Sequence, residues 1–259
     1  AKVSFIEEEV KDIDFNLKKI VLSNRPSVNY SKLVLNYGSQ TIIPKEFESL
    51  VKNRNAFSIK PFLRAYDSIL KEDIFDSVNE LPFVIVGSGL AAIEVSYALR
   101  KRWRDRPLKL LCDSRKINNK ILKSLRNSNI DLVEKLNFDY GKILLCTGNT
   151  SPLWAQKKLL DSDSYGRIIT NQNLQIKSFS GIFAVGDCAV VGSAKRPASG
   201  VFAVKVVNTL VQNLKKDIEG RSLKKWFPQK IGLQIVNIFP SHHPKAFAIY
   251  RNFVFGPSF

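Results

Sequence analysis

The sequence predicts an α/β protein, and two of its features carry this prediction. A short apolar run, Phe83–Val86, is followed by a glycine turn and then by a segment of helical period that continues to Leu99. Several other apolar runs along the chain stop abruptly at a glycine or an aspartate. We therefore expect buried strands joined by helices, which is the pattern of a parallel sheet covered on its faces.

Residues 1–80 predict a small antiparallel meander, an apolar strand and a helix. The expected strands of the meander are Val3–Ile6 and Lys18–Leu22. The next apolar strand ends at Gly38, and Phe62–Leu70 has the spacing of a helix.

The glycine turn carries the most specific site prediction. Gly87, Gly89 and Ala92 form the pattern G-x-G-x-x-A between the strand and the helix. Gly87 permits the tight turn, Gly89 lets a pyrophosphate approach the backbone, and Ala92 lets the helix pack closely on the strand. The N–H groups at the start of the helix would then face the anion. We interpret the turn as a dinucleotide site, and a tight turn without a ligand is the alternative.

The rest of the chain continues to alternate strands and helices. The expected elements are the strands Leu108–Cys112, Ile130–Val133, Lys142–Gly148, Gly181–Asp187, Ile231–Ile238 and Ala246–Val254 and the helices Ile117–Leu125, Pro152–Leu160 and Val201–Ile218. The strand that ends at Gly148 matches the one that ends at Gly38, which suggests equivalent positions in two related domains.

Charge is spread unevenly along the chain. The net charge is +17, and all of the excess lies after residue 80. No basic tract is dense or interleaved with aromatic residues, so we expect a solvated basic surface and no nucleic-acid partner. No apolar run is long enough for a membrane span, and no signal peptide is visible. We expect a cytoplasmic protein and leave peripheral attachment to a membrane open.

The cysteines and histidines predict no metal site. Cys112, Cys146 and Cys188 form no C-x-x-C pair, which favours a reducing compartment and argues against structural zinc or an adjacent redox disulfide. We expect Cys146 and Cys188 to pack in the core, with a redox role for Cys188 as the alternative. His242 and His243 are the only histidines, and we interpret them as part of a loop rather than as metal ligands.

Four motifs, in this order, resemble the two-dinucleotide-binding flavoproteins, which form the pyridine nucleotide-disulfide oxidoreductase superfamily. They are the strand ending at Gly38, the glycine turn followed by Glu94, the strand ending at Gly148, and Gly-Ile-Phe-Ala-Val-Gly-Asp at 181–187. The missing C-x-x-C pair points away from the disulfide reductases. Stretches within 198–229 look like the NADH dehydrogenase-like branch and are especially similar to the module fused to selenophosphate synthetase.

The resemblance implies two cofactors, FAD and NADH or NADPH, and assigns residues to the flavin. Gly186 and Asp187 would hold it, with the Asp187 carboxylate bound to the ribityl chain near the pyrophosphate. Val201 and Phe202 begin a helix whose N-terminus would point at the pyrimidine end of the flavin and stabilise negative charge on the reduced ring. A turn aspartate without a ligand is the alternative for Asp187.

Three more residues are implied by the resemblance to lie beside the nucleotides. Gly38 and Gly148 would occupy positions of close approach, one in each domain. Glu94 would lie near the nicotinamide or at the domain interface, and an exposed helix residue is the alternative.

The preference between NADH and NADPH depends on the residues that follow Leu108–Cys112. Asp113 favours NADH, because a carboxylate at the end of this strand accepts from the ribose hydroxyls. The acidic position of the family aligns best with Cys112, and the cations Arg115 and Lys116 follow, so NADPH stays open.

The resemblance also implies the domain organisation. A Rossmann-like NAD(P)H-binding domain at 81–149 is inserted in an FAD-binding domain formed by 1–80 and 150–225, and a β-rich segment occupies 226–259. The flavin fingerprint of the family should precede Val3, so we expect a truncated chain with an incomplete flavin domain. The quinone-contacting glutamines of the branch are missing as well, which leaves the electron acceptor unidentified.

The function expected from these features is FAD-dependent NAD(P)H oxidoreduction, in which a hydride passes from the nicotinamide to the flavin and on to an unknown acceptor. No catalytic residue is assigned. A non-catalytic module that keeps the fold and senses NAD(H) or regulates a partner is the alternative. A sulfide:quinone-type enzyme, which would need Cys146 close to Cys188, is a third reading. Homodimer formation and a further domain after Phe259 are left open.

Overall fold

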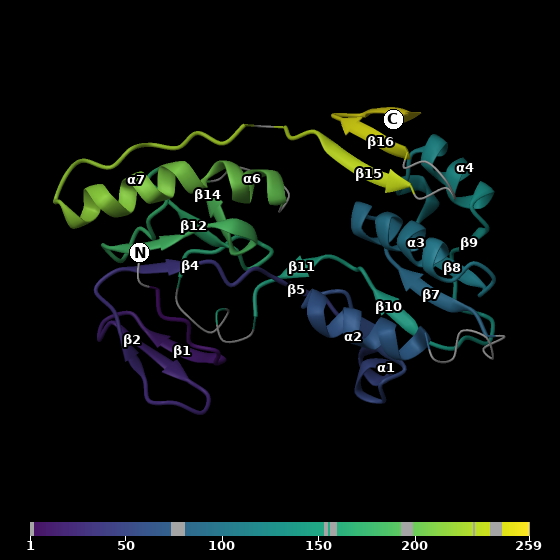
Figure 1. Cartoon of the computed structure of the whole chain (residues 1–259), viewed down its shortest axis with the longest axis horizontal. Coiled ribbons are helices and arrows are strands. Elements are labelled where there is room, and N and C mark those ends of the chain that lie inside the picture. Colours follow the sequence, from purple (N-terminus) through teal and green to yellow (C-terminus); the bar gives the residue numbers. More distant parts are fainter. Residues whose placement is uncertain are drawn as a thin grey trace. The chain divides into compact units, whose positions relative to one another are not determined.

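The computed structural model confirms the α/β fold. It describes residues 3–73, 81–152, 155, 160–192, 199–229, 231–238 and 245–258. The chain divides into two compact units, and most of their helices and strands are labelled in Figure 1. The first unit comprises Ala1–Ser39 with Thr150–Lys230, and the second comprises Gln40–Asn149 with Ile231–Phe259. Within the described ranges, no helix is long and apolar enough to cross a membrane.

The second unit is built on a parallel sheet. Its strands, in spatial order, are β6 (Ala56–Ser58), β10 (Ile143–Leu145), β7 (Phe83–Val86), β8 (Leu108–Leu111) and β9 (Ile130–Val133). Every neighbouring pair is parallel. All residues of the central strands β7 and β10 are buried, as expected for strands that are covered on both faces. The predicted strands of this sheet are therefore confirmed, whereas β6 was not predicted.

Helices connect these strands. α3 (Leu90–Arg102) lies between β7 and β8 in the chain, and α4 (Asn119–Asn127) lies between β8 and β9. α4 begins where the Asn118 side chain accepts a hydrogen bond from the N–H of Lys120, at 3.0 Å. The other helices of the unit are η1 (Lys45–Phe47), α1 (Glu48–Lys52), α2 (Phe62–Asp73) and η2 (Ser114–Lys116).

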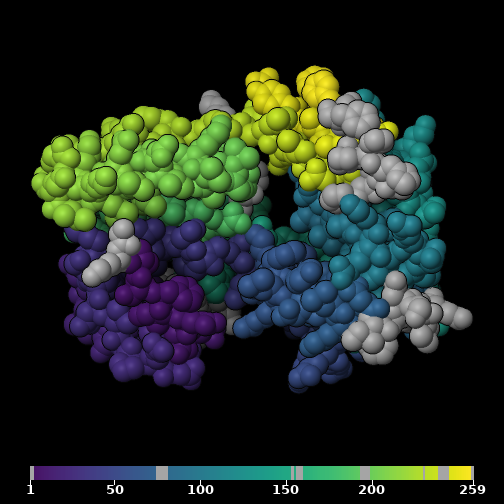
Figure 2. Space-filling view, viewed as in Figure 1, coloured from purple at the N-terminus to yellow at the C-terminus, as the bar shows by residue number. Residues whose placement is uncertain are grey.

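The C-terminal residues form a three-stranded antiparallel sheet that belongs to the second unit. Its strands are β15 (Gln234–Ile238), β16 (Lys245–Tyr250) and β17 (Phe253–Ser258). Val236 and Phe247 are fully buried in one core cluster with residues of α3 and α4. Figure 2 shows the yellow C-terminal strands against the blue and teal residues of this unit. The predicted β-rich C-terminal segment is confirmed.

The first unit contains several small sheets. Its strands are β1 (Val10–Asp14), β2 (Lys19–Leu22) and β3 (Val28–Asn29), which are antiparallel, and the parallel pairs β4 (Leu33–Leu35) with β13 (Ile182–Ala184) and β12 (Ile168–Thr170) with β14 (Ala189–Val191). Its helices include η3 (Gly186–Cys188), α6 (Gly200–Lys205) and α7 (Val207–Ile218). A further two-stranded sheet is formed by β5 (Gln40–Thr41) and β11 (Asn149–Thr150).

A buried asparagine fixes the irregular segment that follows α7. The Asn213 amide donates to the carbonyls of Asn173 and Lys224, each at 2.9 Å, and its side-chain oxygen accepts from the Lys224 N–H at 2.8 Å. The N–H of Trp226 donates to the carbonyl of Gln172, also at 2.8 Å. Residues 221–229 are therefore anchored by hydrogen bonds although they contain no helix or strand.

The first domain boundary differs from the prediction. It was expected between residues 80 and 81, but the structure divides the chain after Ser39. The physical reason is β6, which pairs with β10 and so brings this part of the chain into the sheet of the second unit. Ile231–Phe259 likewise joins the second unit instead of standing apart.

Two predictions of local structure are also wrong. Residues 3–6, predicted as a strand, lie outside regular structure, because no core packs on the side chains of Val3 and Phe5, which are 86% and 88% exposed. The single helix predicted at Val201–Ile218 is divided into α6 and α7 at Val206. The helix predicted at 152–160 falls largely outside the described residues, and the interpretation of His242 and His243 as a loop falls wholly outside them.

A buried ion pair joins α2 to the loop before β8. The Arg106 side chain is fully buried, and its Nη2 lies 2.9 Å from Glu72 Oε2. The guanidinium carbon also lies 4.6 Å from the centre of the Trp103 ring and 5.2 Å from that of Phe83. Pairing with a carboxylate and contact with aromatic faces offset the cost of burying this charge.

Replacing Glu72 with alanine tests the ion pair. Glu72→Ala leaves the buried Arg106 guanidinium without its carboxylate, so we expect the free energy of unfolding to fall by about 3–5 kcal/mol. Asp131→Ala removes an ion pair with Lys109, in which the Asp131 carboxylate is largely exposed. This variant should lower the free energy of unfolding by less than about 1 kcal/mol. Urea unfolding monitored by circular dichroism measures both, and equal losses would contradict this ranking.

Candidate functional site

The glycine turn after β7 has no room for a side chain at its first position. Gly87 has φ +145°, and a Cβ there would lie 2.5 Å from the carbonyl oxygen of Cys146 and 3.3 Å from the Cβ of Ala92. Only glycine fits this conformation and this close approach. Ala92 is itself fully buried against the turn, so the small residue lets α3 approach the strand.

The second glycine of the turn opens the start of α3 to solvent. Gly89 is the N-cap of the helix, no side chain caps it, and a Cβ at this position would meet nothing within 4 Å. The first N–H groups of a helix have no partner within that helix. This end of α3 is therefore suited to bind an anionic group, such as a pyrophosphate.

A cleft of about 750 Å³ lies at the carboxyl edge of the parallel sheet, and we call it the glycine-turn cleft. Its lining comes from residues that directly follow β7, β8, β9 and β10, and from η1 and α1. The volume is in the range of small-molecule and cofactor sites. Ligands of open parallel sheets bind at this edge, where the strand order reverses.

Asp113 reaches this cleft and is tied to the glycine turn. Its N–H donates to Ser88 Oγ at 2.9 Å. Its carboxylate accepts from Arg115 Nε at 2.9 Å and Nη2 at 3.1 Å, and this guanidinium holds the pKa of the carboxyl below its ordinary value. Asp113 thus lines the cleft with its carboxylate already paired to a cation.

Neither Glu94 nor Gly148 lines the cleft. The Glu94 carboxylate accepts from the N–H of Asn237 in β15, at 3.3 Å, so the structure directs it to the C-terminal sheet. Gly148 has φ +107°, and its carbonyl accepts from the N–H of Ile42 at 3.1 Å. Its neighbour Thr147 lines the cleft.

Sequence reasoning missed several residues of the cleft. Thr147 and Glu134 follow β10 and β9, and the rule that parallel strands end at one edge could have found them. Phe47 and Leu50, from η1 and α1, form an apolar wall, and this wall was missed because its segment was assigned to the other domain.

In the first unit, two predicted glycines lie at one sheet edge. β4 and β13 are parallel with Leu35 beside Ala184, so the residues that follow them, up to Gly38 and Gly186, meet at the same edge. Gly186 has φ +75°, and a Cβ there would overlap Asn36 Oδ1. A Cβ at Gly38 would meet nothing within 4 Å. Asp187 follows Gly186 within η3, which contacts α6.

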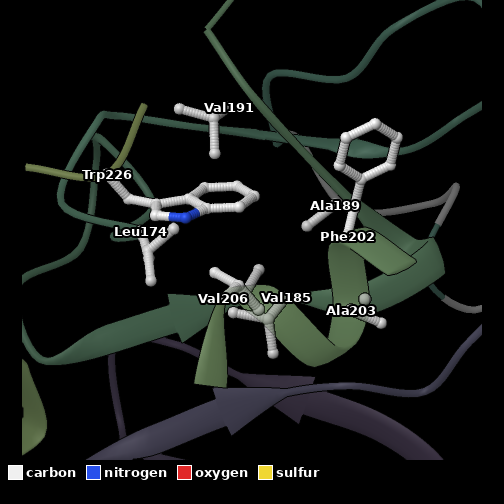
Figure 3. A pocket seen from close by; sticks show the side chains of 10 residues that line it. Leu174, Val185, Ala189, Val191, Phe202, Ala203, Val206 and Trp226 are labelled. Carbon is white, nitrogen blue, oxygen red and sulfur yellow. The ribbon is translucent and has the colours of Figure 1, made fainter. Parts of the chain in front are cut away.

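The start of α6 is packed more tightly than the resemblance implies. Phe202 is buried, and its N–H donates to the carbonyl of Ser199 at 3.0 Å. The cavity beside it is only about 10 Å³, with Phe202 and Trp226 on opposite sides (Figure 3). That space is about the size of one water molecule. The Phe202 side chain is therefore part of the core, and Val201 beside it is partly buried.

The cysteines are buried and none is paired. Burial raises the pKa of Cys146 to about 12 and that of Cys188 to about 11. Cys188 Sγ donates to the carbonyls of Val185 and Leu35, at 3.1 and 3.4 Å, and so helps to close the β4–β13 edge. These features favour the predicted packing role for both. Among the described residues, no cluster of side chains could hold a metal ion.

The sequence is similar to several known proteins. No family model matches it. It is similar to human ferroptosis suppressor protein 1, with 24% identity over 264 residues that cover 88% of this chain and 67% of that protein. It is also similar to a probable NADH dehydrogenase of Dictyostelium discoideum, with 24% identity over 238 residues that cover 71% and 52%. The chain therefore spans about two thirds and about half of the lengths of these relatives.

Solved structures share the fold. A NAD-dependent persulfide reductase from A. fulgidus aligns with a TM-score of 0.68 and 16% identity, over 95% of this chain and 57% of that one. A water-forming NADH oxidase from Lactobacillus brevis, bound to NADH, gives 0.63 and 18%, over 93% and 66%. An engineered water-forming NADPH oxidase bound to NADPH gives 0.64 and 17%, over 93% and 66%.

These likenesses show the fold, which is that of the FAD- and NAD(P)-binding oxidoreductases. The predicted enzyme class, a pyridine nucleotide-dependent flavoprotein oxidoreductase, agrees with these proteins, and so do the predicted cofactors. The likeness to the module fused to selenophosphate synthetase and the truncation of the chain stay predictions.

Alanine at each glycine of the turn tests the difference in packing between the two positions. Gly87→Ala should lower the free energy of unfolding by about 3 kcal/mol, because its Cβ meets the Cys146 carbonyl in a conformation that L-residues avoid. Gly89→Ala should change it by less than about 1 kcal/mol, since its Cβ meets open space. Thermal unfolding measures both, and similar losses would contradict the geometry.

The cysteines provide a chemical check of burial. In native protein at pH 8, we expect iodoacetamide to leave Cys146 and Cys188 unmodified, because raised pKa values keep them as thiols and burial blocks access. In urea both should react within the same period. Mass spectrometry follows the labelling, and rapid modification of native Cys188 would contradict the packing role.

Proposed function

We propose that this chain forms the nicotinamide- and flavin-binding part of an FAD-dependent NAD(P)H oxidoreductase. The second unit binds the nicotinamide dinucleotide and the first unit binds the flavin. The observation that carries the proposal is the glycine turn, where the open start of α3 stands beside a cleft of about 750 Å³. The relatives, which include a probable NADH dehydrogenase, support the same activity.

The residues of the second unit fit a dinucleotide in three ways. The N–H groups at the start of α3, beside Gly89, would bind the pyrophosphate. Ser88 fixes the end of β8 through the Asp113 N–H, at the place where the adenosine ribose lies in this kind of unit. Phe47 and Leu50 offer an apolar wall that would exclude water from a bound ring.

The residues of the first unit fit the close approach of a flavin's phosphate-bearing chain. Gly38 leaves open space at the carboxyl edge of β4, and the φ of Gly186 turns the chain sharply at the edge of β13. Asp187 follows this turn directly, and its carboxylate would accept hydrogen bonds from the hydroxyl groups of the flavin's ribityl chain. When bound, the dinucleotide supplies a hydride that the flavin accepts, and the flavin supplies electrons to the final acceptor.

Anaerobic spectroscopy on the natural full-length protein, reconstituted with FAD, tests the proposal. We expect NADH or NADPH to bleach the visible absorption band of the bound flavin. A band that neither dinucleotide changes contradicts the proposal, and so does a protein that takes up no flavin. Dinucleotide binding without bleaching would favour the non-catalytic sensor.

Asp187 is the residue of the first unit whose loss should matter most. Asp187→Ala removes an acceptor of charge-assisted hydrogen bonds, so we expect the Kd for FAD to rise roughly tenfold to a hundredfold. The matched control is Asp161→Ala, an exposed carboxylate in the same unit. Quenching of FAD fluorescence measures the Kd, and thermal unfolding confirms that both variants fold. Equal FAD affinities of the wild type and Asp187→Ala would contradict a role of Asp187 in the flavin site.

A further inference from the structure

A second cleft lies beside the glycine turn, in the same unit. Its volume is about 340 Å³, and it shares Ser88 and Arg115 with the glycine-turn cleft. Leu90, at the start of α3, lines part of it. Among the described residues, every charged side chain in its lining is a cation, namely Arg115, Lys116 or Arg251. We call it the basic cleft.

Arg251 reaches the basic cleft from the C-terminal sheet. It forms, with Asn252, the two-residue turn that connects β16 to β17, and its φ is +55°. Such turns need a positive φ, which residues other than glycine adopt rarely. The guanidinium carbon also lies 5.8 Å from the centre of the Tyr250 ring. The backbone of a tight turn and this contact together set the position of the cation.

The other two cations belong to the turn after β8. Arg115 donates to both carboxylate oxygens of Asp113, at 2.9 and 3.1 Å, and Lys116 Nζ lies 3.6 Å from one of them. The carboxylate that would accept from a ribose hydroxyl is therefore already engaged by cations. In Rossmann-like units the adenosine ribose lies at the end of this strand. Its 2′ position would therefore face the side chains of Asp113, Arg115 and Lys116.

The charges of the basic cleft suit a phosphate better than a hydroxyl. Three cations line the basic cleft, and only two of them, Arg115 and Lys116, pair with the Asp113 carboxylate. Glu134 lies in the glycine-turn cleft, where Ser114 Oγ donates to it at 3.1 Å. A phosphomonoester carries a charge of about −1.5 to −2 at pH 7, and arginine binds it through paired hydrogen bonds. The side-chain amides of Asn118, Asn252 and Gln234 also line the cleft and offer further donors.

We propose that the basic cleft binds the 2′-phosphate of NADPH, so that this chain prefers NADPH to NADH. The inference rests on the proposed function, because the rest of the dinucleotide would occupy the glycine-turn cleft. It also makes the C-terminal sheet part of the cofactor site through Arg251. Solved structures of this fold include one bound to NADH and one bound to NADPH, so the fold does not decide the preference.

Equilibrium binding to the full chain tests the site with two fragments. The probes are 2′,5′-ADP and 5′-AMP, which differ only in the 2′-phosphate, and calorimetry gives the Kd of each. We expect 2′,5′-ADP to bind at least about tenfold more tightly. Arg251→Gln should lose about tenfold for 2′,5′-ADP and leave 5′-AMP unchanged. The matched control is Lys245→Gln, which removes a cation of the same sheet that does not line the basic cleft.

A second variant, Arg115→Gln, should change the affinities for NADPH and NADH in opposite directions. Arg115→Gln removes a phosphate partner and releases the Asp113 carboxylate for the ribose hydroxyls. We expect it to weaken NADPH binding by about tenfold and to strengthen NADH binding. If Arg115 had only a structural role, Arg115→Gln would weaken the binding of both NADPH and NADH.

The outcomes separate this inference from the proposed function. Equal affinity of the wild type for the two fragments overturns the phosphate site, and so does an Arg251→Gln variant that keeps the full preference. Flavin bleaching by NADH and NADPH with equal affinities overturns the inference alone. Tight, Arg251-dependent binding of 2′,5′-ADP by a protein whose flavin is not bleached supports the phosphate site and overturns the proposed oxidoreduction.

Discussion

The absence of a side chain at residue 87 is the constraint on which the second unit depends. There the backbone of the turn lies against the Cys146 carbonyl at the end of the neighbouring strand, with Ala92 of α3 on its other side. Three elements therefore meet at a point with no space for one methyl group. Because α3 starts so close to the sheet, its open N-terminus stands beside the cleft, and Ser88 can reach the end of β8.

The first unit uses the same geometry with a different surrounding structure. β4 and β13 are parallel neighbours, as are β7 and β10, and each of the four strands is followed closely by a glycine of positive φ. Parallel pairing brings the carboxyl ends of strands to one edge, and glycine lets the chain turn away there without a side chain in the way. The edge is thus left accessible to a ligand in both units.

What the sequence predicted well was local. The apolar run of β7, the glycine spacing and the helical period of α3 all lie within twenty residues, so their pattern was sufficient. β6 was missed because a three-residue strand has almost no pattern of its own, and its partner β10 lies far along the chain. Because β6 was missed, the boundary of the second unit and the apolar wall that includes Phe47 were missed as well. Arg251 could not be linked to the glycine turn either, because only the folded C-terminal sheet brings them together.

The hydrogen bonds of Asn213 constrain how the sequence of this protein can vary among species. Two of its side-chain hydrogen bonds go to the carbonyls of Asn173 and Lys224, which every amino acid provides, and the third comes from the Lys224 N–H, which only proline lacks. Substitutions at either partner therefore leave these bonds in place, whereas a substitution at Asn213 removes all three at once. We expect the segment that follows α7 to drift in sequence while the asparagine that holds it stays fixed.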